Sequence, residues 1–197
     1  MYCKAFAAFS AAILALGLGA CSNTVNALKY TPQAAVQAAA SPTVANVTAT
    51  DHRKEDPTRL ATILGGFGNP LKTLDTTKPV KDEVAAAFAS GLRARGLLAE
   101  NGQAPFRLAL DVRKFDADMY VGRSARIDLS MSVLDAGGRT VYEDSATDIE
   151  SETKILETGI FADIADLQKL CEIVLNRTVD RMLDKPAFRA AVGAAGR

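Results

Sequence analysis

The chain has 197 residues, of which 23 are basic and 23 acidic, so its formal net charge is zero. This balance offers neither the basic surface that binds nucleic acid nor an acidic tail, and we expect no nucleic-acid partner. Tryptophan is absent and aromatic residues make up 6% of the chain, which argues against a site that stacks sugars or bases.

The first 21 residues have the organisation of an export signal. Lys4 precedes an apolar run from Ala5 to Leu18, and small residues follow up to Cys21. The run is too short to span a membrane comfortably and is typical of a secretory signal. Leu18–Cys21 resembles a bacterial lipobox, which implies that residues 1–20 are removed and that Cys21 is lipidated. An ordinary signal peptide with an incidental cysteine is the alternative.

Lipid on Cys21 would make a membrane the first partner of the mature chain. Each buried CH₂ group contributes about 0.8 kcal/mol, so several acyl chains such as palmitate form an anchor that hardly dissociates. The next residue is Ser22, whereas Asp at this position resembles an inner-membrane retention signal of Gram-negative lipoproteins. We therefore expect the protein on the outer membrane, facing the periplasm.

The rest of the chain predicts a tether followed by one domain. Residues 21–42 are rich in Ala, Gln, Ser and Thr and predict a lipidated tether, with a short strand over Leu28–Thr31. Residues 43–197 have the length of a single periplasmic domain. Once the signal is removed and Cys21 is lipidated, only Cys171 remains as a free thiol, so no internal disulfide can form.

Two helices are predicted from apolar residues that recur at helical spacing. The first covers residues 80–95, where Val84, Phe88 and Leu92 share one face and Gly96 provides a left-handed stop. The second covers residues 166–183 and carries a similar apolar stripe.

Strands are predicted over residues 44–51, 106–113 and 126–133, and from 140 to about 150 after a hairpin turn at 135–139. The second and third of these alternate apolar and polar residues, as antiparallel strands with one wet face do. Four acidic residues predict that the last strand is a solvated edge: Glu143, Asp144, Asp148 and Glu150. Residues 51–70 show no regular pattern. The expected fold is α+β, a two-layer sandwich with a mainly antiparallel sheet of about four strands and two long helices on one face.

No group in the sequence stands out as catalytic, and we expect no enzyme activity, cofactor or metal. His52 is the only histidine and has no neighbouring nucleophile in a recognisable motif, so an exposed histidine at a strand end is the favoured interpretation. The acidic strand residues could bind Ca²⁺ weakly, but their spacing is that of a strand and not of a loop. Cys171 lies on an apolar helical stripe, where a free cysteine acts as a small hydrophobe.

Two loop segments are candidate recognition sites for a partner. Asp51 and Arg53 can point the same way and pair with loop backbone, although plain surface charge is an equal alternative. Gly65, Gly66 and Gly68 favour a tight ordered turn. A phosphate cradle would need a following Lys-Ser/Thr pair and a helix start, which this stretch lacks.

The chain resembles the small YajG-like bacterial lipoproteins. The resemblance rests on the lipobox and on several short motifs: Lys29-Tyr30-Thr31-Pro32, Asp51-His52-Arg53, Leu64–Gly68, Leu92–Leu97, Leu134–Tyr142 and Met182–Val192. It implies an envelope location and an α+β architecture more than an activity.

The sequence therefore predicts a lipid-anchored, non-catalytic interaction or accessory domain with an envelope protein as its partner. The alternative is a carrier that holds an apolar ligand between helices and sheet, which would need an internal cavity. The oligomeric state is left open.

Overall fold

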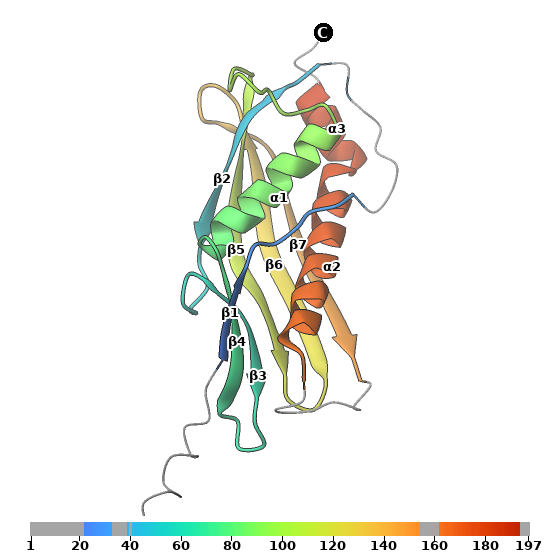
Figure 1. Cartoon of the computed structure of the whole chain (residues 1–197). Helices are drawn as coiled ribbons and strands as arrows, with labels where there is room; N and C mark the ends of the chain where they lie inside the picture. Colours follow the sequence, from blue (N-terminus) through green and yellow to red (C-terminus); the bar gives the residue numbers. More distant parts are fainter. Residues whose placement is uncertain (1–21, 33–38, 40, 154–161, 194–197) are drawn as a thin grey trace, which may run out of the picture.

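The computed structural model describes residues 22–32, 39, 41–153 and 162–193. Within these residues, seven strands form one mixed sheet, and three helices accompany it (Figure 1). In chain order the elements are β1 (Ser22–Asn26), β2 (Val44–Asp51), β3 (Arg59–Leu64), β4 (Pro70–Thr76), α1 (Val80–Ala94), β5 (Phe106–Met119), β6 (Arg123–Leu134), β7 (Thr140–Glu152), α2 (Ile164–Leu183) and α3 (Pro186–Gly193).

The predicted sheet of about four mainly antiparallel strands with two long helices is wrong, although the α+β class holds. The strand order is β1-β4-β3-β5-β6-β7, with β2 also paired to β5. β1, β3 and β4 are additional strands, and three pairings are parallel: β1 with β4, β2 with β5, and β3 with β5. β3 and β4 lie in or next to the stretch without a regular pattern, and β1 lies within the segment predicted as a tether.

β5 organises the sheet because one of its edges is shared by two strands. β2 pairs with β5 from Phe106 to Val112, and β3 pairs with β5 from Ala117 to Met119. The other edge of β5 is covered along its whole length by β6. The connection between β2 and β3 therefore has to leave the sheet and rejoin it beside the same strand.

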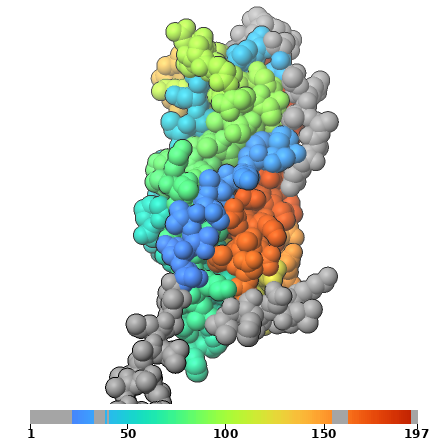
Figure 2. Space-filling view, in the orientation of Figure 1, coloured from blue at the N-terminus to red at the C-terminus, as the bar shows by residue number. Residues whose placement is uncertain are grey.

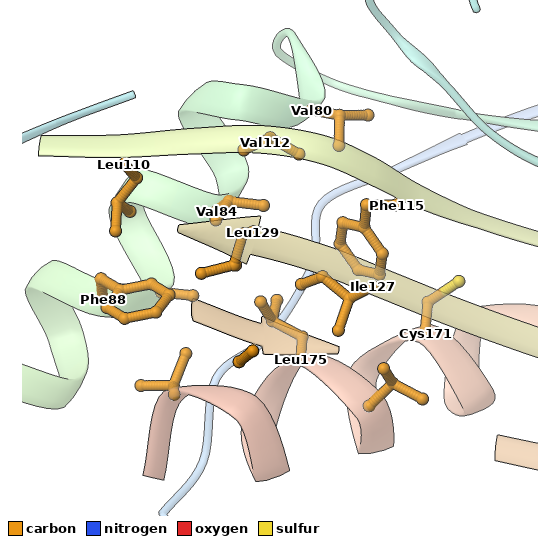
Figure 3. Packing of buried hydrophobic residues seen from close by; sticks show 14 of the residues in the cluster. Val80, Val84, Phe88, Leu110, Val112, Phe115, Ile127, Leu129, Cys171 and Leu175 are labelled. Carbon is orange, nitrogen blue, oxygen red and sulfur yellow. The ribbon is translucent and has the colours of Figure 1, made fainter. Parts of the chain in front are cut away.

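The described helices lie on one face of the sheet (Figure 1). α1 packs mainly against β2, while α2 runs along β6 and β7. The space between the layers is filled by fully buried side chains, among them Phe88, Phe115, Leu129 and Leu175 (Figure 3). The two long helices approach closely at Gly91, where a Cβ atom would lie 2.7 Å from the Val179 side chain.

Cys171 is part of this buried layer, with no exposed surface. Burial raises the pKa of its thiol, because the thiolate would be formed without water. In a chain that starts at Ser22, where Cys171 is the only thiol, we expect an aqueous thiol reagent to modify the folded protein only as it unfolds. A Lys54→Cys variant, with an exposed second thiol, serves as the positive control. Rapid labelling of Cys171 under native conditions would contradict the packing described here.

Candidate functional site

The first predicted recognition segment lies where the chain crosses from β2 to β3. The Arg53 side chain is fully buried, and it forms an ion pair with the Asp51 carboxylate at 2.9 Å. Its Nε atom also donates to the same carboxylate, at 3.0 Å. The guanidinium therefore meets the carboxylate with two parallel donors, the strongest arrangement for such a pair.

The remaining donors of Arg53 hold backbone carbonyls together. Nη1 donates to the oxygens of Arg59 and Phe115, at 2.9 and 3.1 Å, and Nη2 donates to that of Pro57 at 3.0 Å. Phe115 lies between the part of β5 that pairs with β2 and the part that pairs with β3. β2 and β3 leave a gap beside β5 at this point. Arg53 donates there a hydrogen bond to β5 that a neighbouring strand would otherwise provide.

Electrostatics agree with this geometry. Burial alone would raise the pKa of Asp51, but the hydrogen bonds from the Arg53 side chain and backbone outweigh it and lower that pKa. The Arg53 side chain is buried and its donors are already engaged in hydrogen bonds, so a partner could not contact it directly. Such a partner would contact neighbouring side chains instead, for example the half-exposed imidazole of His52, which lies 3.3 Å from Asp111.

The second predicted segment forms the tip of the β3–β4 hairpin. The Gly65 amide donates to the Asn69 carbonyl at 2.8 Å, and the Gly68 amide donates to Gly65 at 2.9 Å. Gly68 has φ of 77°, which a residue with a side chain rarely adopts. Between Gly66 and Gly68, the Phe67 side chain is completely exposed. The three glycines therefore shape a tight turn that presents an aromatic ring to the outside.

A buried cluster that the sequence does not predict lies between α1, α2 and the segment after β1. Arg95, directly after α1, has a fully buried side chain. It donates to both carboxylate oxygens of Asp184, at 2.8 and 2.6 Å, to Asp180 at 2.9 Å and to the Tyr30 hydroxyl at 3.0 Å. Tyr30 in turn donates to Asp180.

This cluster fixes the N-terminal segment to the helices. Residues 22–32 cross between α1 and α2 before the chain enters β2 (Figure 2), and Tyr30 is the polar contact between that segment and Arg95. Burial is the main cause and the hydrogen bond to Asp180 the second cause that raise the pKa of Tyr30 to about 12. A signal was present in the sequence: Asp180 and Asp184 are four residues apart at the C-terminal end of α2, a spacing that brings both to the same side of a helix.

The Arg95 cluster predicts how stability depends on pH. The side-chain hydrogen bond from Arg95 is the main cause that holds the pKa of Asp184 below its usual value. A carboxyl with a depressed folded-state pKa stabilises the fold above its unfolded pKa of about 3.9, and that contribution disappears as pH falls through the folded value. We expect the free energy of unfolding to fall as pH is lowered below about 4, and to fall less steeply in an Asp184→Asn variant. Denaturant titrations at several pH values measure the free energy of unfolding of both proteins. If it fell equally steeply with pH in the wild type and in Asp184→Asn, the role assigned to the Asp184 carboxylate would be contradicted.

The prediction that the acidic residues of β7 form a solvated edge is wrong for most of them. β7 is the last strand of the sheet, but three of its acids face the helices and are paired. Asp148 accepts a hydrogen bond from Thr178 and lies 2.8 Å from Arg181. Glu150 pairs with Arg177, and Asp144 pairs with Lys185. Only Glu143 points to the open side, so the acidic set serves mainly to dock α2 on the edge strand.

Within the described parts of the chain, no group of three or more histidine, cysteine, aspartate or glutamate side chains could hold a metal ion. Over the same residues, no helix combines the length and the apolar character needed to cross a bilayer.

Comparison with solved structures shows a shared fold. A protein of the DUF330 family from Xanthomonas campestris has a TM-score of 0.58 at 17% identity, covering 89% of this chain and 98% of that one. A PelC dodecamer subunit from Paraburkholderia phytofirmans has a TM-score of 0.43 at 15% identity, with 75% and 92% covered. A minor lipoprotein from Acinetobacter baumannii has a TM-score of 0.39 at 12% identity, with 57% and 86% covered. The last two scores are too low to carry an argument about this chain.

No protein-family model matches the sequence, and no curated protein matches it significantly. Bacterial lipoproteins are among the solved structures that resemble the chain. These likenesses do not single out the YajG-like proteins, so that narrower resemblance stays a hypothesis.

Proposed function

We propose that the protein is a lipid-anchored, non-catalytic interaction domain of the bacterial cell envelope, attached to the outer membrane and facing the periplasm. The lipobox-like residues before Ser22 support the anchor, and the resemblance to YajG-like lipoproteins supports the location. A structural use of charge supports the non-catalytic role, because Arg53, Arg95 and three of the β7 acids are engaged in ion pairs.

The observation that carries this proposal is the open face of the sheet. The described helices cover one face only (Figure 1), and most residues of β5, β6 and β7 that point the other way are polar or small. A shallow depression on this face is lined by Asp111, Ser130, Ser132, Glu143 and Ser145. Val141 and Ile149 are exposed on the same side of β7. A broad, mostly polar surface with a few apolar side chains suits a protein partner better than a small ligand.

The packing between helices and sheet argues against the carrier alternative. A ligand between helices and sheet would need a cavity there, whereas the side chains at that position, such as Phe88, Phe115 and Leu175, are fully buried members of one apolar cluster (Figure 3). Two surface depressions lie outside that layer, one on the open sheet face and one beside Pro42 and Leu98.

Site-specific photocrosslinking in native membranes tests the proposal. A photoreactive residue at Ser145, on the open face, is expected to form one dominant crosslink to an envelope protein in stoichiometric yield. The matched control carries the same group at Ile173, which is exposed on α2 and should give none. Equal crosslinking from both positions, or none from Ser145, would contradict an interaction through this face, and turnover of an envelope substrate by the purified protein would contradict a non-catalytic role.

A further inference from the structure

Exposed apolar side chains gather at one end of the molecule. Phe67 forms the tip of the β3–β4 hairpin and is fully exposed, while Tyr120 and Val121 form the tip of the β5–β6 hairpin and are 49% and 62% exposed. The Tyr120 hydroxyl donates to the Gly66 carbonyl at 3.1 Å. The two tips are therefore held side by side, and both lie at the lower end in Figure 1.

The tips carry no charge that would resist burial in an apolar medium. Residues 64–71 and 119–122 contain no acidic or basic side chain. The hairpin between β6 and β7, at the opposite end of the sheet, is different: its turn carries Asp135 and Arg139, which pair with each other at 2.8 Å. The long axis of the domain thus has one apolar tip and one charged tip.

The start of the mature chain lies at the apolar end. β1 runs parallel to β4, and Ser22 is opposite Lys72, five residues after Phe67. At about 3.3 Å per strand residue, Ser22 is no more than about 17 Å from the hairpin tip. The residue that precedes Ser22 is Cys21, one Cα–Cα step of about 3.8 Å away. No spacer separates the lipobox cysteine from the sheet.

We propose that the β3–β4 and β5–β6 tips insert into the interface of the same membrane that holds the acyl chains of Cys21. This inference rests on the lipid anchor proposed above. An anchor attached directly to an edge strand brings this end of the domain against the lipid, and aromatic side chains are favoured at the headgroup level. The long axis of the domain then extends from the membrane into the periplasm, and its open sheet face is roughly perpendicular to the membrane plane.

The absence of tryptophan in the chain allows a direct test with one introduced fluorophore. A Phe67→Trp variant of the mature, lipidated protein is placed in vesicles of phosphatidylethanolamine and phosphatidylglycerol that contain brominated acyl chains. The matched control is Val141→Trp, whose position is 45% exposed and lies beside the charged hairpin. We expect several-fold stronger quenching and a blue-shifted emission for Phe67→Trp alone, with unchanged circular dichroism for both variants.

Three results would overturn the inference. If both variants float with the vesicles but are equally unquenched by lipid, the anchor stands and the tips do not insert. If Phe67→Trp is shielded in native outer membranes but exposed to water in protein-free vesicles, the tips contact a protein and not lipid. If neither variant floats, the proposed anchor itself fails, and the inference falls with it.

Discussion

Replacing Arg53 by alanine is expected to lower the free energy of unfolding by about 3–5 kcal/mol, the usual cost of removing one partner of a buried ion pair. The Arg53 side chain is fully buried, and Asp51 is only 17% exposed. The substitution leaves the Asp51 carboxylate without its cation. It also removes the donors that reach the carbonyls of Arg59 and Phe115, at the point where β5 exchanges one parallel neighbour for another.

Two variants make this expectation specific. Lys54→Ala changes an exposed cation in the next position and should leave the free energy of unfolding nearly unchanged. Arg53→Lys keeps the charge but cannot present parallel donors to a carboxylate and reach the carbonyls at once, so it should lose most of what Arg53→Ala loses. Denaturant unfolding followed by circular dichroism compares the three. An Arg53→Ala protein as stable as Lys54→Ala would contradict the role assigned to Arg53.

Replacing Arg95 by alanine is expected to cost about 3 kcal/mol, the lower end of the range for a broken buried pair. The arginine is fully buried, but Asp184 is 47% exposed and can regain water when its partner is lost. Tyr30 and Asp180 lose their shared cation at the same time. The segment around Tyr30 should therefore loosen from the helices before the rest of the domain unfolds.

The chain provides a close control two residues away. Arg93 is half exposed and pairs with Glu100 on the surface, and such pairs contribute less than about 1 kcal/mol. Arg93→Ala should thus remain near wild-type stability. Limited trypsin digestion adds a local measurement, because cleavage after Lys29 should accelerate in Arg95→Ala only. Equal stability and equal cleavage rates in the two variants would contradict a structural role for the cluster.

The sequence predicts best those elements whose periodicity is imposed by the core. The helix expected over residues 80–95 is observed as Val80–Ala94, because Val84, Phe88 and Leu92 pack on the sheet. The second helix begins earlier than expected, at Ile164, because the side chain of Asp163 caps it by accepting from the Ala165 amide. The strand over residues 44–51 has the expected bounds.

Two pairings of the missed strands, β1 with β4 and β3 with β5, depend on distant parts of the chain. β1 has almost no buried side chain, so its residues carry no alternating pattern, and its neighbour among the described strands is β4, about 50 residues away. β3 is flanked by the charged run after β2 and by the glycine turn, and these signals dominate its local sequence. Long-range parallel pairing leaves little local trace, because neither partner strand is adjacent in the chain.

Only part of the candidate site can be predicted from the sequence. The pairing of Asp51 with Arg53 follows from their spacing, but the burial of Arg53 depends on the gap that β2 and β3 leave beside β5. The glycines around Phe67 predict a turn, whereas the joining of that turn to Tyr120 is a property of the assembled sheet. The inward direction of Asp148 requires knowledge of which face of β7 meets α2.

The proposed anchor, membrane orientation and envelope location all follow from the covalent state of Cys21. Intact-mass spectrometry of the protein recovered from the outer membrane of an expressing Gram-negative cell measures that state directly. We predict a chain that begins at Cys21 and carries fatty acyl chains, and a Cys21→Ser protein that is absent from this membrane. A mature chain cut at another residue, with Cys21 unmodified or removed and the protein in the soluble fraction, would contradict the account.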